Sequence, residues 1–409
     1  MLGHPGHAAP APGEPVLRWN TRTHSIAGIE AELARIWSSV SLETAGDDGE
    51  PERRVAPRSS VMNLVVIAGR SEIGERIAAI VEGLTGRHPS RTLVVSQADP
   101  DGPAWLDAQV QAHCMLPRDG AAETCAELVY VTAGGQAGQH LAGLVAPLLI
   151  HDLPVTIWWP GEPNLDSPAT ADLLDLADRV LVDGSAWSGD GLASLVAMSR
   201  LPRRFKVEVS DFAMLRQSRW REAIASTFDR PAMLPFLGGI REITVMYAAR
   251  AGSDGRANAI KPLYHVAWLA SRLRMTCVNP LVGEQAPWSG YRAELRQGRR
   301  RIDVVLRPEE SASPPGTTLS VRLRAERRRD RLTVAVTAQA EGVTVLATLN
   351  GEAMPERRFL GARRREGELL AETIEGAATD RISSSALAMA GSIIGADSGP
   401  ATVMTRANA

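Results

Sequence analysis

Lysine is almost absent from this chain. Two of its 45 basic residues, Lys206 and Lys261, are lysines, and all the others are arginines. The basic residues nearly balance 47 acidic ones, so the formal net charge is −2. A charge so close to neutral gives no overall attraction to nucleic acid or to an anionic membrane surface. We therefore expect neither of them as a partner.

Cysteine is also scarce, and long apolar runs are missing. Cys114, Cys125 and Cys277 form no CxxC pair and no zinc-binding spacing, so we expect buried free thiols in a reducing compartment. The N-terminal residues have neither a basic start nor an apolar core and do not resemble a signal peptide. Apolar runs fall well short of the roughly 20 residues that a membrane-spanning helix needs. These features predict a cytoplasmic protein without a membrane span.

Strand and helix patterns alternate between residues 61 and 210 of the 409-residue chain. A chain of this length has material for two or more domains. The predicted strands are residues 61–68, 92–96, 128–132, 155–159, 180–182 and 205–209. Near-continuous apolar strands separated by helices are typical of a doubly wound, mostly parallel sheet. We predict an α/β domain for this part.

The pattern changes after residue 210. Asp211 is placed to cap a long helix, residues 212–229, that connects two domains. Segments with period-two alternation follow at residues 291–296, 301–306, 318–324, 332–338 and 343–349, and helices are expected at 259–273, 367–375 and 381–394. Alternating strands joined by short polar turns favour an antiparallel sheet. We therefore predict an α+β second domain.

Four parts follow from these patterns. They are a flexible tail, amphipathic helix and linker over residues 1–57, an α/β domain with its long connecting helix over 58–235, an α+β domain over 236–397, and a disordered tail over 398–409. The amphipathic helix is expected over residues 25–42, where apolar residues recur at three- and four-residue steps. Gly, Asp and Pro in residues 45–57 indicate a linker.

Motifs for phosphate binding and catalysis are incomplete. Residues 69–76, GRSEIGER, occupy the strand-to-helix position of a phosphate-binding loop, but Glu75 stands where a lysine is needed. A carboxylate there would repel phosphate, so a simple tight turn is the better interpretation. Asp172, Asp175 and Asp178 recur at three-residue steps and indicate a solvated helix face rather than a metal site. We predict no catalytic residue, no metal site and no cofactor.

A second glycine-rich turn leaves an alternative open. Residues 133–138, AGGQAG, follow a predicted strand and approximate the dinucleotide-binding fingerprint, with alanine at the first glycine position. The candidate ligand-binding glycines are Gly134, Gly135 and Gly138. The acidic residue that should end the next strand is missing. A phosphosugar- or nucleotide-binding enzyme or sensor that uses this turn is therefore the alternative function.

Two basic segments are candidate contact surfaces. The candidate contact residues are Arg58, Arg87, His88, Arg91, Arg327, Arg328 and Arg329. Residues 87–91 precede a predicted strand, on the sheet edge where Arg58 is also expected; the alternative is a helix C-terminus whose basic side chains complement the helix dipole. Residues 322–331 lie around a predicted hairpin and form either a solvated sheet face or a docking surface for an acidic partner.

Five segments, taken in order, carry a resemblance to a known family. They are RSSVMNLVV (58–66), RHPSRTLVV (87–95), PLLIHDLPVTIWWPG (147–161), RWREAIASTFD (219–229) and WLASRL (268–273). Their structural signature consists of Asp152, Pro154, Trp158, Trp159, Trp220 and Arg221. The chain resembles the OpcA family of glucose-6-phosphate dehydrogenase assembly proteins.

The resemblance implies a non-catalytic accessory protein. Such a protein assembles or allosterically activates glucose-6-phosphate dehydrogenase, the NADP-dependent entry enzyme of the oxidative pentose phosphate pathway, which is the expected partner. The resemblance lends no active-site residue, and the oligomeric state stays open. Because Trp158 and Trp159 are neighbours in one strand, we expect them on opposite faces of the sheet and therefore both in the core.

Overall fold

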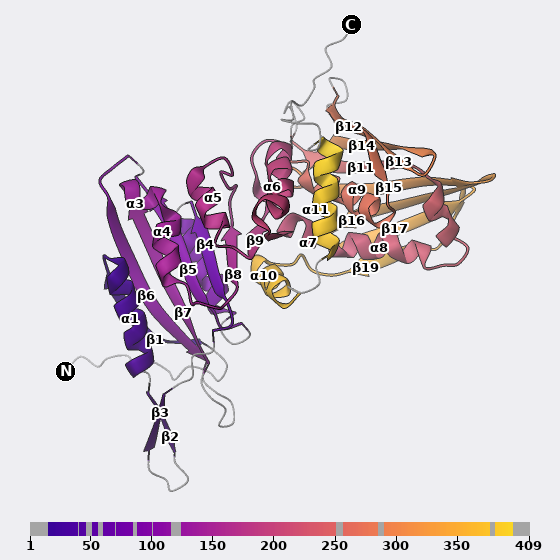
Figure 1. Cartoon of the computed structure of the whole chain (residues 1–409). Coiled ribbons are helices and arrows are strands. Elements are labelled where there is room, and N and C mark those ends of the chain that lie inside the picture. Colours follow the sequence, from indigo (N-terminus) through magenta and orange to yellow (C-terminus); the bar gives the residue numbers. More distant parts are fainter. Residues whose placement is uncertain are drawn as a thin grey trace. The chain divides into compact units, whose positions relative to one another are not determined.

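The computed structural model describes residues 15–39, 41–45, 51–55, 60–69, 71–84, 88–99, 101–115, 124–250, 257–284, 290–376 and 381–395. Two compact units make up the chain (Figure 1). The first consists of Met1–Val180 and Leu370–Glu375, and the second of Leu181–Leu369 and Gly376–Ala409. The units divide at Val180, well before the boundary predicted at residue 235.

The first sheet has eight strands in the order β1-β6-β7-β5-β4-β8-β9-β10. Its strands are β1 (Pro15–Thr23), β4 (Asn63–Ala68), β5 (Arg91–Ala98), β6 (Trp105–Met115), β7 (Thr124–Gly134), β8 (Val155–Trp159), β9 (Arg179–Val182) and β10 (Glu208–Asp211). Neighbours among β7, β5, β4 and β8 are parallel, whereas β6 and β1 add in antiparallel fashion at one edge. The predicted mixed α/β class is confirmed, because these central strands are buried on both faces.

The helices of the first unit are shorter than predicted. They are α1 (Ile26–Ser39), α2 (Ser71–Glu82), α3 (Gly135–Gln139), α4 (Leu141–Val145), η1 (Ala146–Leu148) and α5 (Pro168–Leu174). Residues 138–150 do not form one continuous helix, because non-helical backbone at His140 separates α3 from α4. The doubly wound arrangement of helices stays a prediction.

Strands β1 and β6 were not predicted. In β6, Ala108, Val110 and Ala112 are buried and alternate with less buried polar residues, as in a strand with one face in the core. Strand β1 pairs with β6 alone, so it is an edge strand. It lies within residues 1–57, where β2 (Ser41–Ala45) and β3 (Pro51–Val55) also pair. No strand was predicted in these residues, and β3 falls in the segment expected to be a linker, residues 45–57.

Two of the cysteines form a disulfide. Cys114 in β6 and Cys125 in β7 are directly opposite each other in the antiparallel pair, with Cα atoms 4.0 Å apart. The prediction of three free thiols is wrong for this pair, because the missed strand β6 places side by side two residues that are 11 positions apart in sequence. Cys277 is a free thiol, as expected, but it is only partly buried.

The second unit contains a nine-stranded sheet in the order β12-β13-β14-β11-β15-β16-β17-β18, with β19 paired to β17. Its strands are β11 (Ile240–Ala249), β12 (Thr276–Gly283), β13 (Tyr291–Gln297), β14 (Arg300–Glu310), β15 (Thr318–Arg327), β16 (Asp330–Gln339), β17 (Gly342–Leu349), β18 (Glu352–Ala353) and β19 (Arg357–Leu360). Strands β11 and β14 are parallel, and the other neighbouring strands of this sheet are antiparallel. Burial alternates along the strands, which confirms the mostly antiparallel second sheet.

Helices α8 (Ser218–Phe228), α9 (Ile260–Arg272) and α11 (Arg381–Ile394) and the short η3 (Leu234–Gly239) pack on this sheet. The other helices from residue 184 onwards are η2 (Gly184–Ala186), α6 (Leu192–Phe205), α7 (Phe212–Leu215) and α10 (Glu366–Glu375), whose last six residues belong to the first unit. Helix α9 packs on β11, and α8 packs on β16 and β17. Helix α6 and strand β10 contact α11, which explains why the second unit begins so early. The single connecting helix expected over residues 212–229 is interrupted between α7 and α8.

Trp158 and Trp159 are both buried, with 0% and 5% of their surface exposed, as predicted. The turn before them is held by the buried Asn63, whose Oδ1 accepts from Ile150 N at 2.8 Å and whose Nδ2 donates to Leu153 O at 3.3 Å. No helix within the described ranges is long and apolar enough to cross a membrane.

Candidate functional site

A cluster of polar side chains lies at the ends of β9 and β10. Asp183 directly follows β9, and Asp211 is the last residue of β10. Gly184 N donates to Asp211 Oδ1 at 2.9 Å, so the two strand ends meet. In open α/β sheets ligands bind outside the carboxyl ends of strands. This cluster is therefore the candidate site that the fold itself indicates.

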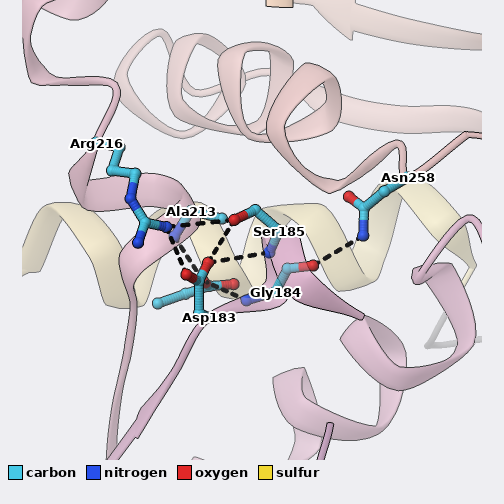
Figure 2. Close-up of polar contacts among 7 residues, drawn as sticks. Asp183, Gly184, Ser185, Ala213, Arg216 and Asn258 are labelled. Atoms are coloured by element: carbon cyan, nitrogen blue, oxygen red, sulfur yellow. Dashed lines mark hydrogen bonds and ion pairs between the residues drawn. The ribbon is translucent and has the colours of Figure 1, made fainter. Parts of the chain in front are cut away.

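Asp183 is paired with an arginine from the next helical segment. Arg216 Nη1 donates to Asp183 Oδ2 at 2.6 Å and to Ser185 Oγ at 3.2 Å. Ser185 donates to Asp183 Oδ1 through both its hydroxyl, at 2.5 Å, and its backbone N–H, at 3.2 Å. Figure 2 shows Arg216 and Ser185 converging on this carboxylate. The negative charge of Asp183 is thus compensated within the cluster.

Asp211 caps a helix, as predicted. Its Oδ1 also accepts from Ala213 N at 2.8 Å, and its Oδ2 accepts from Tyr264 Oη at 2.9 Å. Burial raises the pKa of Asp211 to about 7, and the charge of Asp183 acts in the same direction, against the hydrogen bonds from Gly184, Ala213 and Tyr264. Asp211 therefore changes charge near neutral pH.

The start of α9 is held against the same strand ends. Asn258 Nδ2 donates to Gly184 O at 2.9 Å (Figure 2) and to Trp187 O at 3.2 Å. Asn258 Oδ1 accepts from Ile260 N at 3.1 Å. This one side chain connects the η2 turn to the first turn of α9.

Lys261 adds a second titratable group in that first turn. Burial lowers the pKa of its ammonium to about 8, and Arg363 and Arg216 add to this effect, whereas Asp183 and Asp211 oppose it. The backbone carbonyl of Lys261 accepts from Gln217 Nε2 at 2.7 Å, which connects α9 to the break between α7 and α8. Lys261 and Asp211 can both exchange protons close to pH 7.

The geometry nevertheless favours a structural role for the cluster. Both carboxylates accept their hydrogen bonds from the chain itself, so a ligand would have to displace those donors. A Cβ atom on Gly184 would lie 2.6 Å from Asp211 Oδ2, which shows how closely the cluster is packed. The cluster connects η2, α7 and α9. Within the described residues, no group of three or more His, Cys, Asp or Glu side chains could hold a metal ion.

The glycine-rich turn is filled by the chain itself. Gly134 ends β7, and a Cβ atom on it would lie 2.1 Å from the indole of Trp105. Gly135 has φ +55°, and its Cβ would lie 2.5 Å from Gly102 O. A Cβ on Gly138 would lie 2.7 Å from Ala133 O. The three glycines are thus explained by close packing, and helix α3, which begins at Gly135 and contains Gly138, has five residues.

In the described part of the basic segment, residues 88–91, the side chains of His88 and Arg91 contact other residues of the chain. Arg91 is buried, pairs with Glu127 on the neighbouring strand and donates Nη1 to Leu148 O at 2.8 Å. This burial does not favour Arg91 as a contact residue, and that role stays a prediction. His88 Nε2 lies 3.0 Å from Glu375 Oε1 of α10, so its ring is occupied within the first unit. Arg58 and Arg87 lie outside the described residues.

The second basic segment is exposed. Arg327 ends β15, Arg328 and Arg329 form the turn before β16, and all three side chains are exposed. This agrees with both readings made from sequence, a solvated surface or a docking surface, and their role as contact residues stays a prediction.

The signature residues make contacts within the fold that indicate structural roles. Asp152 has φ +67° in the turn before β8, and the carbonyl of Pro154 accepts from Asn63 N at 2.9 Å. Trp220 lies with its ring 5.1 Å from that of the buried His265. Arg221 Nη1 donates to Met214 O at 2.6 Å and so bridges the break between α7 and α8.

Sequence reasoning missed most of the polar cluster. Asp183 follows a buried strand directly and precedes a glycine, a position where a polar side chain at a strand end can be expected. Lys261 is one of two lysines in an arginine-rich chain and opens an apolar helix, which was an available signal. Asn258 gave no signal, because its partners come from residues 184 and 187, far away in sequence.

Two family models match the chain. The glucose-6-phosphate dehydrogenase subunit N-terminal domain of the OpcA type matches residues 81–200, and the corresponding C-terminal domain matches residues 207–387. The chain belongs to the OpcA family. The residues matched by the two family models cover most of both units.

Curated relatives agree with this assignment. OxPP cycle protein OpcA of Synechocystis is 25% identical over 205 residues, which cover 49% of this chain and 41% of the relative. The protein of the same name from Nostoc punctiforme is 25% identical over 214 residues, which cover 52% of this chain and 43% of the relative. The chain thus matches less than half the length of these relatives.

Solved structures show more distant likenesses. A 3-ketoreductase from Actinomadura kijaniata has a TM-score of 0.46 and 13% identity over 82% of this chain and 96% of its own. The WlbA dehydrogenase from Thermus thermophilus has a TM-score of 0.42 and 13% identity over 84% of this chain and 97% of its own. Likenesses at this level say nothing about activity.

Proposed function

We propose that the chain is a non-catalytic, cytoplasmic accessory protein that assembles or allosterically activates glucose-6-phosphate dehydrogenase in the oxidative pentose phosphate pathway. The observation that carries the proposal is the pair of family matches, which together span residues 81–200 and 207–387 and are both described as domains of a glucose-6-phosphate dehydrogenase subunit. The names of the two relatives place them in the same pathway.

The polar cluster supports the non-catalytic part of this proposal. A reaction centre needs groups that are free to meet a substrate, whereas the carboxylates of Asp183 and Asp211 accept their hydrogen bonds from within the cluster. Activation then depends on binding: an accessory protein raises activity by preferring the active state of the enzyme, and about 1.4 kcal/mol of preference shifts the population ratio tenfold.

The alternative, a phosphosugar- or nucleotide-binding enzyme or sensor, is less well supported. It would use the turn of Gly134, Gly135 and Gly138, and that turn packs against Trp105 and Gly102. Thermal unfolding with glucose 6-phosphate, 6-phosphogluconate, NADP and NADPH separates the two functions. We expect no ligand-dependent rise in melting temperature; a saturable rise that Gly138→Val abolishes would support the alternative.

The accessory role is tested by mixing the chain with the glucose-6-phosphate dehydrogenase of the same host at micromolar concentration. Gel filtration with light scattering should show co-migration and a change in the mass of the enzyme species. The chain alone should show no dehydrogenase, lactonase or kinase turnover. Separate elution at every ratio tested would contradict the proposal.

A further inference from the structure

Arginine gathers at one end of the nine-stranded sheet. Strand β11 runs parallel to β14, with Glu242 opposite Asp303, and antiparallel to β15, with Glu242 opposite Arg324. The starts of β11 and β14 and the end of β15 therefore lie at the same end. It follows that the β13–β14 turn and the β15–β16 turn flank the first residues of β11, although the turns are 30 positions apart in sequence.

We call residues 240–241, 296–301 and 326–331 the arginine end. Its arginines are Arg241, Arg296, Arg299, Arg300, Arg301, Arg327, Arg328, Arg329 and Arg331, and all of these side chains are exposed. The same residues include two carboxylates, Glu326 and Asp330. In a chain whose formal net charge is −2, nine arginines against two carboxylates form a strongly basic surface.

Internal pairing compensates only part of this charge. Arg301 Nε lies 3.3 Å from Oε1 of Glu294, an acidic residue of β13. Glu326 lies 3.6 Å from Arg241 and 3.9 Å from Arg331, at the limit of an ion pair. Asp330 accepts from Asn350 Nδ2 at 3.0 Å rather than from an arginine. No ion pair with a described residue involves Arg296, Arg299, Arg327, Arg328 or Arg329, so these guanidinium groups remain available for a partner.

The two hairpins share one turn geometry but differ at one position. Gly298, the first turn residue of β13–β14, has φ +60°, and Arg328, the first turn residue of β15–β16, has φ +57°. Positive φ suits glycine and strains any residue with a Cβ atom, so glycine is the residue that the turn itself favours. Arg328 in that position therefore makes the turn less stable than glycine would. No contact of its side chain with another described residue offsets this loss. Backbone strain of this kind is often found at binding sites.

The chemistry of the surface fits carboxylates of a protein. Guanidinium groups bind carboxylates in a bidentate manner and are enriched at protein interfaces. Residues 240–241, 296–301 and 326–331 contain no aromatic side chain on which a base could stack, which disfavours single-stranded nucleic acid. Glu326 also stands between the two turns, where it would repel a continuous phosphate backbone.

We propose that the two hairpins form one docking site for a carboxylate-rich segment of a protein partner. The identification of this partner as glucose-6-phosphate dehydrogenase rests on the function proposed above. The docking site itself does not depend on that function. The β13–β14 hairpin, with Arg299 and its neighbours, extends the docking surface from the β15–β16 hairpin across β11. Both turns belong to one sheet, so they meet the partner at a fixed spacing.

Paired glutamine substitutions test the site. The variants are R296Q/R299Q, R327Q/R329Q and the combination of all four, and the matched control is R203Q/R204Q in the exposed last turn of α6. Affinity for the enzyme and for poly-L-glutamate is measured at low and high salt. We expect each pair to weaken binding about tenfold at low salt and the combination to weaken it further, with smaller effects at high salt because salt screens exposed charges. The control should bind like the parent.

Arg328→Gly separates binding from stability. We expect this variant to melt at a higher temperature than the parent, because glycine relieves the positive φ, and yet to bind the acidic partner more weakly. A destabilised fold cannot produce that combination, so the variant remains informative if the other substitutions unfold the chain.

The outcomes distinguish the two proposals. If the parent binds poly-L-glutamate through these arginines but does not bind the enzyme, the docking site stands and the proposed partner is wrong. If the parent binds the enzyme and the four-residue variant binds it equally well at low salt, the docking site is wrong and the accessory role stands. Tighter binding of a single-stranded RNA oligonucleotide than of poly-L-glutamate would also overturn the docking site.

Discussion

Burial shifts the pKa values of two residues of the second unit, Asp211 and His265, in opposite directions. The pKa of Asp211 is raised from 3.8 to about 7 by burial, so the folded chain holds this proton more tightly than the unfolded chain does. Its contribution to the free energy of unfolding is complete below pH 3.8 and is lost as the pH rises towards 7. Acid should therefore stabilise the cluster around Asp211.

Asp211→Asn tests this titration. The amide keeps an acceptor for Gly184 N and Ala213 N, and its NH₂ group can donate to Tyr264 Oη. We expect the parent to lose stability relative to the variant by up to about 1.4 kcal/mol per pH unit between pH 4 and 7. Urea unfolding at several pH values measures the difference; parallel pH profiles of the two proteins would refute the assignment.

His265 shows the opposite behaviour. Burial lowers its pKa from 6.5 to about 3, and the nearby Arg221 adds to the effect, so the folded chain keeps this ring neutral. Its contribution to stability is present above pH 6.5 and is lost as the pH falls towards 3. His265→Gln keeps a donor for Thr318 Oγ1 and removes the titration, so the variant should unfold less readily in acid. His151→Gln, at an exposed histidine, is the control and should behave like the parent.

At the scale of elements, a buried ion pair joins two central parallel strands. Arg91 of β5 and Glu127 of β7 are opposite each other, 8% and 0% exposed. We expect Arg91→Met or Glu127→Gln to cost about 3–5 kcal/mol, because each leaves one buried polar partner uncompensated. The double variant R91M/E127L should recover most of this loss. Chemical denaturation measures both.

An exposed pair provides the control for that experiment. Arg219 and Glu222 are 2.9 Å apart, and about half of each side chain is exposed. Breaking such a surface pair should cost no more than about 1 kcal/mol. An equal loss from both pairs would contradict the buried role of Arg91 and favour its earlier interpretation as a contact residue.

The tandem tryptophans are predicted to stabilise the first unit rather than to contact a partner. Trp158 and Trp159 are almost fully buried, on opposite faces of β8. Replacing either with alanine should lower the free energy of unfolding by about 3–5 kcal/mol. A variant that melts like the parent but fails to activate the enzyme would show that the pair is an interface.

Helices and strands with long, uniform hydrophobic patterns were the easiest to predict from the sequence. Strand β8 and the alternating strands of the second sheet were predicted within a few residues, because burial on one or both faces leaves a period that can be read locally. Strand β1 was missed because an edge strand depends on its neighbour rather than on its own apolar content. The break between α7 and α8 is bridged by the contact of Arg221 with Met214, which no local pattern reveals.

The candidate site was less predictable than the fold. Asp211 was found as a helix cap, but its contacts with Gly184 and Tyr264 join segments 27 and 53 residues away. Arg91 was taken as a candidate contact residue, because Glu127, which compensates its charge, lies on a strand that is adjacent in space and not in sequence. Charged residues in a single sequence reveal their partners only once the sheet order is known.

At the scale of the whole molecule, two units provide a scaffold with an arginine end on the second sheet and internally bonded polar groups elsewhere. The proposed accessory role needs an exposed surface that a partner can bind, and the arginine end provides one.

The most direct test is a titration of glucose-6-phosphate dehydrogenase from the same host with this chain, followed by NADPH formation at a glucose 6-phosphate concentration below the KM. We predict a saturable rise in rate as the chain is added, through a lower KM, a higher kcat or both, and a smaller rise with the four-arginine variant. A rate that stays constant up to a large molar excess of the chain would contradict the accessory role.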